Sequence, residues 1–227
     1  MIDRPARQIK SFVLRTGRLT KGQSQALEKM WPLIGIDYAP EALDWTVVFG
    51  NNIPVVVEIG FGNGESLAEM AKATPNTNFL GIEVHTPGVG HLLGLAEQLE
   101  LSNLRVMQHD AIDILNHMIP DDSLEKLQLF FPDPWHKKRH HKRRIVQPDF
   151  LTLIAKKLSS GGIFHMATDW EPYAEFAYNF LHQHSQFRNS ETEQQFSSQP
   201  AYRPTTKFET RGQRLGHKVC DLIWIRV

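Results

Sequence analysis

Four acidic side chains lie at the ends of short apolar segments, where the chain could bind a small molecule. Glu58 and Glu83 fall within the last two positions of two such segments, and Asp110 and Asp133 follow two others by two residues. If these segments are parallel strands, their carboxyl ends share one edge of a sheet, and open α/β sheets bind ligands at that edge. We therefore expect these carboxylates to surround a common ligand.

A glycine-rich loop follows the first segment, with Gly60, Gly62 and Gly64 in the run EIGFGNG. Glycines let the backbone turn tightly and approach a ligand, and a following helix offers unpaired N–H groups. The spacing G-x-G-x-G differs from the G-x-G-x-x-G of dinucleotide-binding proteins. Taken alone, the loop could be only a tight turn. With Glu58 beside it, the loop suits a cation such as the sulfonium and ammonium of S-adenosylmethionine better than a pyrophosphate.

The next two acids fit the nucleoside part of the same cofactor. Glu83 lies 21 residues after Gly62, where an acid can bind both ribose hydroxyls. Asp110 can accept a hydrogen bond from an adenine amino group. Three acids at the ends of three successive segments favour S-adenosylmethionine over a nicotinamide cofactor.

The fourth acid is held between prolines in the run FPDPW. Pro132 and Pro134 stiffen the backbone around Asp133, since a residue before proline is kept extended. A rigid carboxylate beside the proposed cofactor is a candidate for orienting a substrate. A turn aspartate without function is the alternative.

A run of six Lys/Arg without an acid spans 137–144, directly after FPDPW. Such runs are often solvated surface or localisation signals. This run, however, directly follows the sheet edge proposed for catalysis, where the backbone of an RNA substrate would have to pass. Each phosphate neutralised would contribute a slope of about −0.7 to −0.9 in log K against log salt. His136, His140 and His141 could suggest a metal site. We reject a metal, because fixed positive charges oppose a dication and no carboxylate or thiolate completes the ligand set.

Two C-terminal features complete the candidate site. Asp169 follows the apolar segment 162–167 and is either another ligand-binding acid or the N-cap of the next helix. Thr206, Lys207, Phe208 and Glu209 offer a hydroxyl, a cation, an apolar face and a carboxylate in succession. A guanine could be held by that carboxylate at its N1–H/N2–H edge and by stacking.

Apolar segments and helix-length stretches alternate in a way that predicts βαβ units. The expected strands are 55–59, 79–83, 104–108, 127–131, 162–167 and 221–227, and the expected helices are 24–30, 65–73, 89–101, 111–118, 149–158 and 171–184. The prediction is an α/β, doubly wound, Rossmann-like sheet, mostly parallel with an antiparallel last strand. Residues 1–35 would form a basic N-terminal arm with a short helix, and residues 36–227 a single domain.

Composition excludes several classes of protein. The 227 residues are 41% hydrophobic and 22% charged, which is enough for a core and unlike a disordered chain. The single cysteine excludes a disulfide framework and is compatible with a reducing, cytoplasmic location. No apolar run approaches the ~20 residues of a membrane span, so we expect no membrane partner.

The net charge of zero hides a segregation of charge. Residues 1–23 carry +5, residues 24–136 carry −12, residues 137–144 carry +6 and residues 145–227 carry +1. The acidic block holds the four carboxylates proposed around a cationic cofactor. The basic blocks flank it in sequence, so the total does not count against an RNA partner.

Six runs together resemble the bacterial tRNA (guanine-N7-)-methyltransferase family, and the resemblance extends from about residue 10 to 227. They are VEIGFGNG, GIEVHTPGVG, HDA, FFPDPWHKKRHHKRR, HMATDWEPYAEF and RPTTKFETRGQRLGHKV, with KSFVLRTGRLT at the N-terminus. FPDPWHKKRHHKRR and TKFETRG are specific to this family, whereas the glycine loop indicates only the wider class of Rossmann-like methyltransferases.

The resemblance implies an enzyme that transfers a methyl group from S-adenosylmethionine to guanine N7 in the tRNA variable loop. It implies Asp133 as the catalytic residue, and tRNA as a partner of a monomer or weak dimer. The implied cofactor contacts are Glu58, Gly60, Gly62, Gly64, Glu83, Asp110 and Asp133. The implied RNA or guanine contacts are Lys137, Arg139, Lys142, Arg143, Arg144, Asp169, Thr206, Lys207, Phe208 and Glu209. A non-catalytic RNA-binding protein, or a methyltransferase with a non-RNA substrate, is the alternative.

Overall fold

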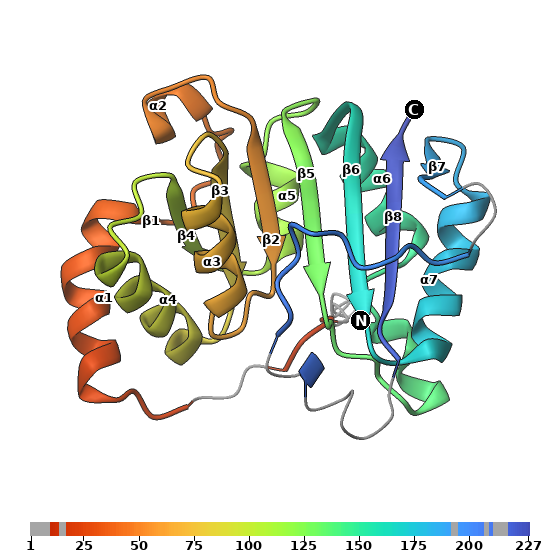
Figure 1. Ribbon diagram of the computed structural model, residues 1–227, viewed down its shortest axis with the longest axis horizontal. Helices are drawn as coiled ribbons and strands as arrows, with labels where there is room; N and C mark the ends of the chain where they lie inside the picture. Colours follow the sequence, from red (N-terminus) through yellow and green to blue (C-terminus); the bar gives the residue numbers. More distant parts are fainter. Residues whose placement is uncertain (1–9, 14–16, 192–194, 207–208, 211–217) are drawn as a thin grey trace, which may run out of the picture.

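One mixed sheet forms the centre of the protein (Figure 1). The structure is a computed structural model that describes residues 10–13, 17–191, 195–206, 209–210 and 218–227. Within these ranges, the sheet has eight strands in the order β1-β4-β3-β2-β5-β6-β8-β7. The strands are β1 (Gly35–Ile36), β2 (Val55–Ile59), β3 (Asn78–Glu83), β4 (Leu104–Gln108), β5 (Leu124–Phe130), β6 (Leu158–Thr168), β7 (Phe187–Asn189) and β8 (Cys220–Arg226).

The strand directions confirm the predicted doubly wound α/β sheet. Strands β1 to β6 pair in parallel, whereas β8 runs antiparallel to both β6 and β7. Strand β2 has β3 on one side and β5 on the other, so the winding reverses between β2 and β5. In open α/β sheets this reversal is where ligands bind, at the carboxyl ends of the strands.

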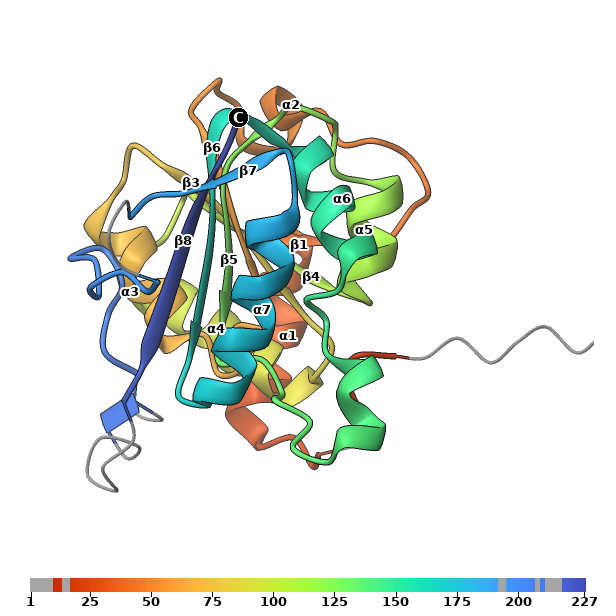
Figure 2. The ribbon, with the colours of Figure 1, turned by 90° about the vertical axis from the view of Figure 1, so that its right-hand side faces the viewer.

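Helices cover the two faces of the sheet and give two hydrophobic clusters (Figures 1 and 2). The helices are α1 (Lys21–Ile34), α2 (Trp45–Phe49), α3 (Glu65–Ala73), α4 (Thr86–Gln98), α5 (Ala111–His117), the 3₁₀ helix η1 (Lys138–Arg143), α6 (Pro148–Lys157) and α7 (Glu171–Gln183). Helices α1, α3 and α4 pack on one face, where Val56 points, and α5, α6 and α7 pack on the other, where Val55 and Val57 point. Alternate side chains of β2 therefore enter different clusters, as its continuous apolar run predicts.

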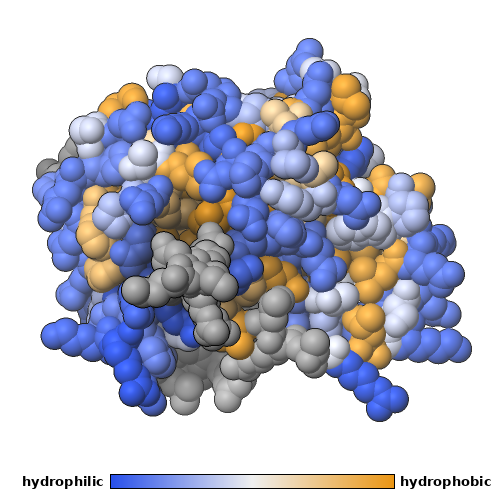
Figure 3. Space-filling view, turned by 180° about the vertical axis from the view of Figure 1, so that it is seen from behind, coloured by the Kyte–Doolittle hydropathy of each residue, from blue (hydrophilic) through white to orange (hydrophobic). Residues whose placement is uncertain are grey.

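Seen from the side of α5, α6 and α7, hydrophilic side chains cover most of the surface and hydrophobic ones form separate patches (Figure 3). These helices bury their apolar sides against the sheet and leave polar sides to solvent. In the part of the chain that the structure describes, no helix has the length and apolar character needed to cross a membrane.

On the face that carries α3, none of the helices among the described residues covers β5, β6 and β8. A coil that includes residues 199–206 crosses these strands instead (Figure 1). Several side chains beneath it are polar: Lys126 Nζ lies 3.6 Å from the centre of the Tyr202 ring, and His165 hydrogen-bonds to the Tyr202 hydroxyl. The two halves of this face are thus built differently, one by helices and one by a loop.

Helix α1 departs from the sequence prediction, which ended it before Pro32. The helix begins at Lys21 behind a capping box formed by Thr20 and Gln23, and continues through Pro32 to Ile34. A proline in the last turn removes only one helical hydrogen bond, and burial of Met30 and Ile34 supports that turn. Because α1 packs against α4, its packing belongs with the sheet, and the domain boundary after residue 35 stays a prediction.

Four short elements were not predicted from sequence: β1, α2, η1 and β7. Strands of two and three residues are too short to show a hydrophobic period. Helix α2 did have terminal signals, since Asp44 accepts hydrogen bonds from the Thr46 and Val47 N–H groups and Gly50 ends the helix at φ +73°.

Candidate active site

The glycine loop joins β2 to α3 and adopts a backbone that needs glycine. Gly60, Gly62 and Gly64 all have left-handed φ values, of +73°, +60° and +76°. The loop also lies tightly against the first turn of α4, because a Cβ on Gly88 would stand 2.1 Å from the Gly62 carbonyl oxygen. The predicted tight loop at the start of a helix is therefore present, held from the side by α4.

Glu83 is the last residue of β3, and its side chain holds the glycine loop in place by hydrogen bonds. Its carboxylate accepts hydrogen bonds from the N–H groups of Gly62 (2.9 Å), Val84 (2.6 Å) and His85 (3.0 Å). A carboxylate has about four lone-pair positions, so the group can still accept from a ligand hydroxyl while it holds the loop. Glu83 lines a pocket of about 260 Å³, where it could bind a diol.

Asp110 lies in the same pocket and caps helix α5. One oxygen accepts from the Ile112 N–H group at 3.1 Å, and the other lies 3.5 Å from the Lys10 ammonium. The apolar side chains that line the pocket around these acids belong mainly to Ile59, Ile82, Ala111, Leu129 and Ile145. The pocket thus combines an apolar slot with acids near its rim, as a nucleoside requires.

Two residues of the N-terminal arm form part of the wall of this pocket. Ser11 and Phe12 line it, and the 131–144 region holds them there. Trp135 Nε1 donates to the Ser11 carbonyl at 3.1 Å. Arg143 donates to the carbonyls of Lys10 (3.1 Å) and Phe12 (3.0 Å), and its guanidinium lies 4.0 Å from the centre of the Trp135 ring.

Glu58 lies on the opposite face of the sheet, in a larger pocket of about 600 Å³. The residue is 2% exposed, and its Oε2 atom has no hydrogen-bond partner among the described residues. Burial, and then the charge of Glu83, raise the pKa of Glu58 to about 8. A cation bound beside it would reverse that shift, because opposite charge favours the ionised carboxylate.

Asp133 lies where the two pockets meet and lines both. Phe131 and Trp135, on either side of it, have left-handed φ values of +50° and +48°, which are rare for large side chains. The Phe131 N–H group also donates to the Ala167 carbonyl of β6 at 2.8 Å. The carboxylate is exposed on a backbone that is fixed at both ends.

The basic run divides into exposed and structural residues. Lys137, Arg139 and Lys142 are exposed, as contact with an RNA backbone would require. Arg144 is only 3% exposed. It donates to the Pro134 carbonyl at 2.9 Å and lies under 5 Å from the ring centres of Tyr173 and Phe176, so it anchors the FPDPW loop from beneath.

The C-terminal candidates are also divided. Asp169, Thr205 and Thr206 line the larger pocket together with Asp133. The N-cap of α7 is Trp170, so the alternative that Asp169 caps this helix is wrong. Glu209 is 1% exposed and forms an ion pair with Arg203, whereas Lys207 and Phe208 lie outside the described residues.

Sequence reasoning missed Arg203, Asp221 and His165, which form a buried polar cluster beside the larger pocket. A signal existed, because Gln128 and His165 lie between apolar residues within the predicted strands 127–131 and 162–167, and Lys126 directly precedes the first of these strands. Such alternation indicates a sheet face that no helix covers. Within the described ranges, no group of three or more His, Cys, Asp and Glu could hold a metal ion.

Comparisons with known proteins agree with this geometry. A family model described as "Putative methyltransferase" matches residues 52–222. A tRNA (guanine-N(7)-)-methyltransferase of Aeromonas hydrophila is 59% identical over 97% of this chain and 93% of its own length. The chain belongs to the tRNA (guanine-N7-)-methyltransferase family. A relative from Cronobacter sakazakii with the same name is 57% identical over 99% of this chain and 94% of its own length.

Solved structures that resemble this family member are more distant. The aminoglycoside resistance methyltransferase NpmB1 gives a TM-score of 0.55 at 15% identity, covering 80% of this chain and 93% of its own. TrmN from Thermus thermophilus gives 0.52 at 15% identity, covering 77% and 44%. At such identities the likeness shows the fold alone, a Rossmann-like methyltransferase sheet.

Proposed function

We propose that the protein transfers a methyl group from S-adenosylmethionine to N7 of a guanine in the variable loop of tRNA. The observation that carries the proposal is the position of Asp133 on the wall shared by two pockets. One pocket suits the nucleoside of the cofactor, and the other is open to a base. The Asp133 carboxylate, which lies between the two pockets, would face the reacting atoms.

The residues present fit S-adenosylmethionine. Glu83 would bind the ribose hydroxyls, and Asp110 the adenine amino group, within the apolar slot. Glu58 has a buried oxygen without a partner and would accept a hydrogen bond from the ammonium of the methionine part. The bound cofactor supplies an electrophilic methyl group on a sulfonium.

Methylation of guanine N7 requires the protein mainly to position the two reactants. N7 carries an in-plane lone pair, so no proton has to leave before it attacks, and a strong general base is unnecessary. Rate enhancement should rest on holding N7 in line with the methyl group. The Asp133 carboxylate would orient the guanine and stabilise the positive charge that the ring acquires.

The tRNA would be bound mainly through its phosphates. Lys137, Arg139 and Lys142 are exposed on and beside η1, directly after the Asp133 loop. Their position would bring the phosphates close to the pocket that takes the base. Extrusion of the target guanine into that pocket would bring N7 up to the methyl group, as in other enzymes that do chemistry on a base.

The test is methyl transfer from radiolabelled S-adenosylmethionine to unmodified tRNA, followed by nucleoside mapping. We expect label in N7-methylguanosine of the variable loop. Label in a protein or a small molecule instead would support a different methyltransferase. Binding of tRNA without any transfer would support the non-catalytic alternative.

A further inference from the structure

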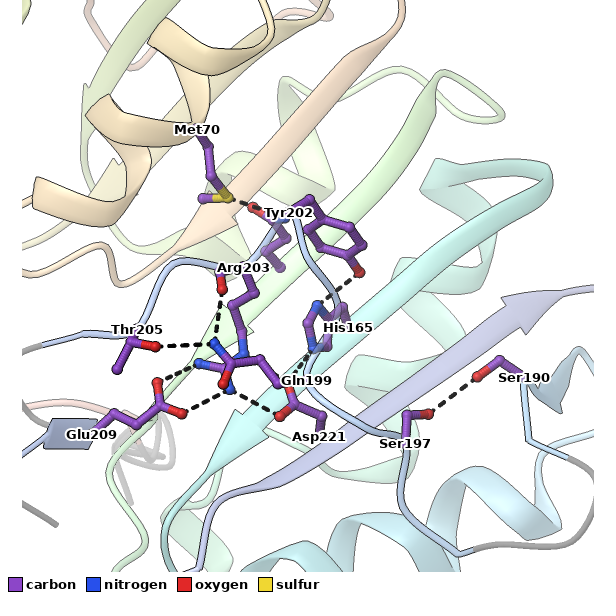
Figure 4. A network of polar contacts seen from close by, with 11 residues as sticks. Met70, His165, Ser190, Ser197, Gln199, Tyr202, Arg203, Thr205, Glu209 and Asp221 are labelled. Atoms are coloured by element: carbon purple, nitrogen blue, oxygen red, sulfur yellow. Dashed lines mark hydrogen bonds and ion pairs between the residues drawn. The ribbon is translucent and has the colours of Figure 1, made fainter. Parts of the chain in front are cut away.

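A buried ion-pair network holds the segment that borders the larger pocket (Figure 4). Arg203 is 2% exposed and lies between two carboxylates. Its guanidinium donates to Asp221 through Nε (2.7 Å) and Nη2 (2.9 Å), and to Glu209 through Nη1 (2.7 Å) and Nη2 (3.1 Å). Two bidentate contacts fix a guanidinium in both position and orientation.

The network is tied to the sheet. Asp221 lies in β8, directly opposite Ala167 of β6. Its carboxylate is 2.8 Å from His165 Nε2, and His165 Nδ1 is 2.9 Å from the Tyr202 hydroxyl. The coil thus contacts rigid strands at two successive residues, Tyr202 and Arg203.

The same network fixes the pocket wall. This segment contributes Pro204, Thr205 and Thr206 to the lining. Gln199 Nε2 donates to the Arg203 carbonyl at 2.9 Å and lies 3.4 Å from Thr205 Oγ1. The Glu209 N–H group donates to Thr206 Oγ1 at 3.1 Å. The hydroxyls on the wall are therefore set by residues behind it.

Glu209 is engaged away from the base. Each of its carboxylate oxygens accepts from Arg203, and Oε2 also lies 3.4 Å from the Thr206 N–H group. Its residue is 1% exposed, in contrast to Asp133 on the pocket rim. To bind a guanine edge, Glu209 would have to abandon a bidentate contact with a buried cation, which leaves a charge unpaired.

We propose that Glu209 and Arg203 are positioning residues, which act as one unit to place the Thr205–Thr206 wall against the substrate base. Glu209 does not bind the guanine itself. The inference rests on the proposed function, because it concerns the base pocket of the same reaction. It revises the expectation from sequence that this carboxylate holds the N1–H/N2–H edge.

A double-mutant cycle separates the two roles. We would measure kcat, KM for tRNA and the Kd of S-adenosylmethionine for Arg203→Met, Glu209→Gln and the double variant of the full-length chain. Misplacing a substrate by about 1 Å can cost about 100-fold in rate. We expect each single variant to lose kcat on that scale and the double variant to lose little more, since residues that act as a unit are not additive. Both binding constants should stay within about threefold, because cofactor and phosphate contacts lie elsewhere.

Two further variants keep the result interpretable. Arg203→Lys keeps the charge but can bond only one carboxylate well, so it should lose less kcat than Arg203→Met and still fold if the latter does not. Arg226→Met is the matched control, because Arg226 pairs with Asp122 at the far end of β8. Its kcat should stay within about twofold of wild type.

Three results would overturn the inference. Losses that multiply in the double variant would mean that Glu209 acts on the substrate independently of Arg203. A parallel loss of cofactor binding would mean that the network only supports the fold. A wild-type protein that binds cofactor but does not methylate tRNA would overturn the proposed function, and the inference with it.

Discussion

The two sides of the site use different means to hold their functional groups. On the cofactor side, Glu58 and Glu83 belong to strands and Asp110 caps a helix, so sheet register positions them. On the RNA side, Asp133, the basic segment and residues 204–206 lie in loops. Two buried arginines, Arg144 and Arg203, hold those loops from behind.

This difference predicts which substitutions should impair cofactor binding and which should impair catalysis or RNA binding. Cofactor binding should depend on the acids themselves and on the close contact between the glycine loop and α4. Catalysis should depend also on residues that never contact the RNA, such as Arg203, whereas RNA affinity should depend mainly on the exposed cations. Variants on one side should therefore leave the other side's binding constant intact.

Asp133 belongs to both sides and should give the largest effect. We expect Asp133→Asn to lower kcat by about 100- to 1,000-fold, the cost of removing one electrostatic contact to a transition state. The amide keeps the size of the side chain, so the Kd of S-adenosylmethionine should stay within a few-fold. Rate measurements with saturating tRNA, together with calorimetric cofactor binding, would check both parts. Full activity would remove Asp133 from the mechanism.

The exposed cations should dominate RNA affinity. Changing Lys137, Arg139 and Lys142 together to Ala should weaken tRNA binding by about 10- to 100-fold at moderate salt. It should also reduce the salt slope by about 2, because up to three phosphate contacts are lost. Filter binding over a range of salt concentrations measures both. An unchanged slope would contradict the phosphate contacts, and cofactor affinity serves as the internal control.

Glu58 should make cofactor affinity depend on pH. Its carboxyl is protonated below a pKa of about 8 in the ligand-free protein, and a cationic ligand favours the ionised form. Affinity should therefore rise by about tenfold from pH 6 to pH 7, where the ligand ammonium stays charged. Glu58→Gln should remove this dependence. Parallel pH profiles for the two proteins would show that Glu58 is not the group responsible.

The same carboxyl should affect stability with the opposite sign. Between about pH 4.5 and pH 8 the folded ligand-free protein keeps a proton that the unfolded chain releases. Its free energy of unfolding should therefore fall by up to about 1.4 kcal/mol per pH unit relative to Glu58→Gln. Denaturant unfolding of both proteins at several pH values measures this difference. A constant difference would contradict the raised pKa.

Arg144 should behave unlike its exposed neighbours. Arg144→Met should lower the free energy of unfolding by about 2 kcal/mol and Tm by about 4–8 °C, since it breaks the contacts to Pro134 and the two aromatic rings. The salt slope of tRNA binding should not change. If the salt slope of tRNA binding fell while Tm stayed unchanged, Arg144 would contact an RNA phosphate and would not be a structural residue.

The sequence predicted the strands and the positions of the acids correctly where an apolar segment is followed closely by glycines or by an acidic residue. The strand ranges 55–59 and 104–108 agree with β2 and β4, because continuous apolar runs end at a glycine loop and near an acid. The same regularity placed Glu58, Glu83 and Asp110 at one edge. Their convergence follows from parallel strands and needs no knowledge of side-chain packing.

The rest depends on tertiary packing that spacing does not encode. Arg143 and Arg144 are adjacent and chemically alike, yet one contacts the N-terminal arm and the other fills a space between Pro134 and two rings. From sequence, Glu209 and Asp133 are both candidates to bind a guanine. In the structure Glu209 is buried and paired with Arg203, whereas Asp133 is exposed. The partners of a buried charge lie far apart in sequence and become visible only in the fold.

The most direct test of the account concerns the acceptor atom. A tRNA with 7-deazaguanosine at the target position replaces N7 by a carbon that has no lone pair and leaves the other edges of the base unchanged. We predict that the protein binds this tRNA with the affinity of the unmodified one and transfers no methyl group to it. Methylation of both tRNAs at similar rates would contradict attack by N7.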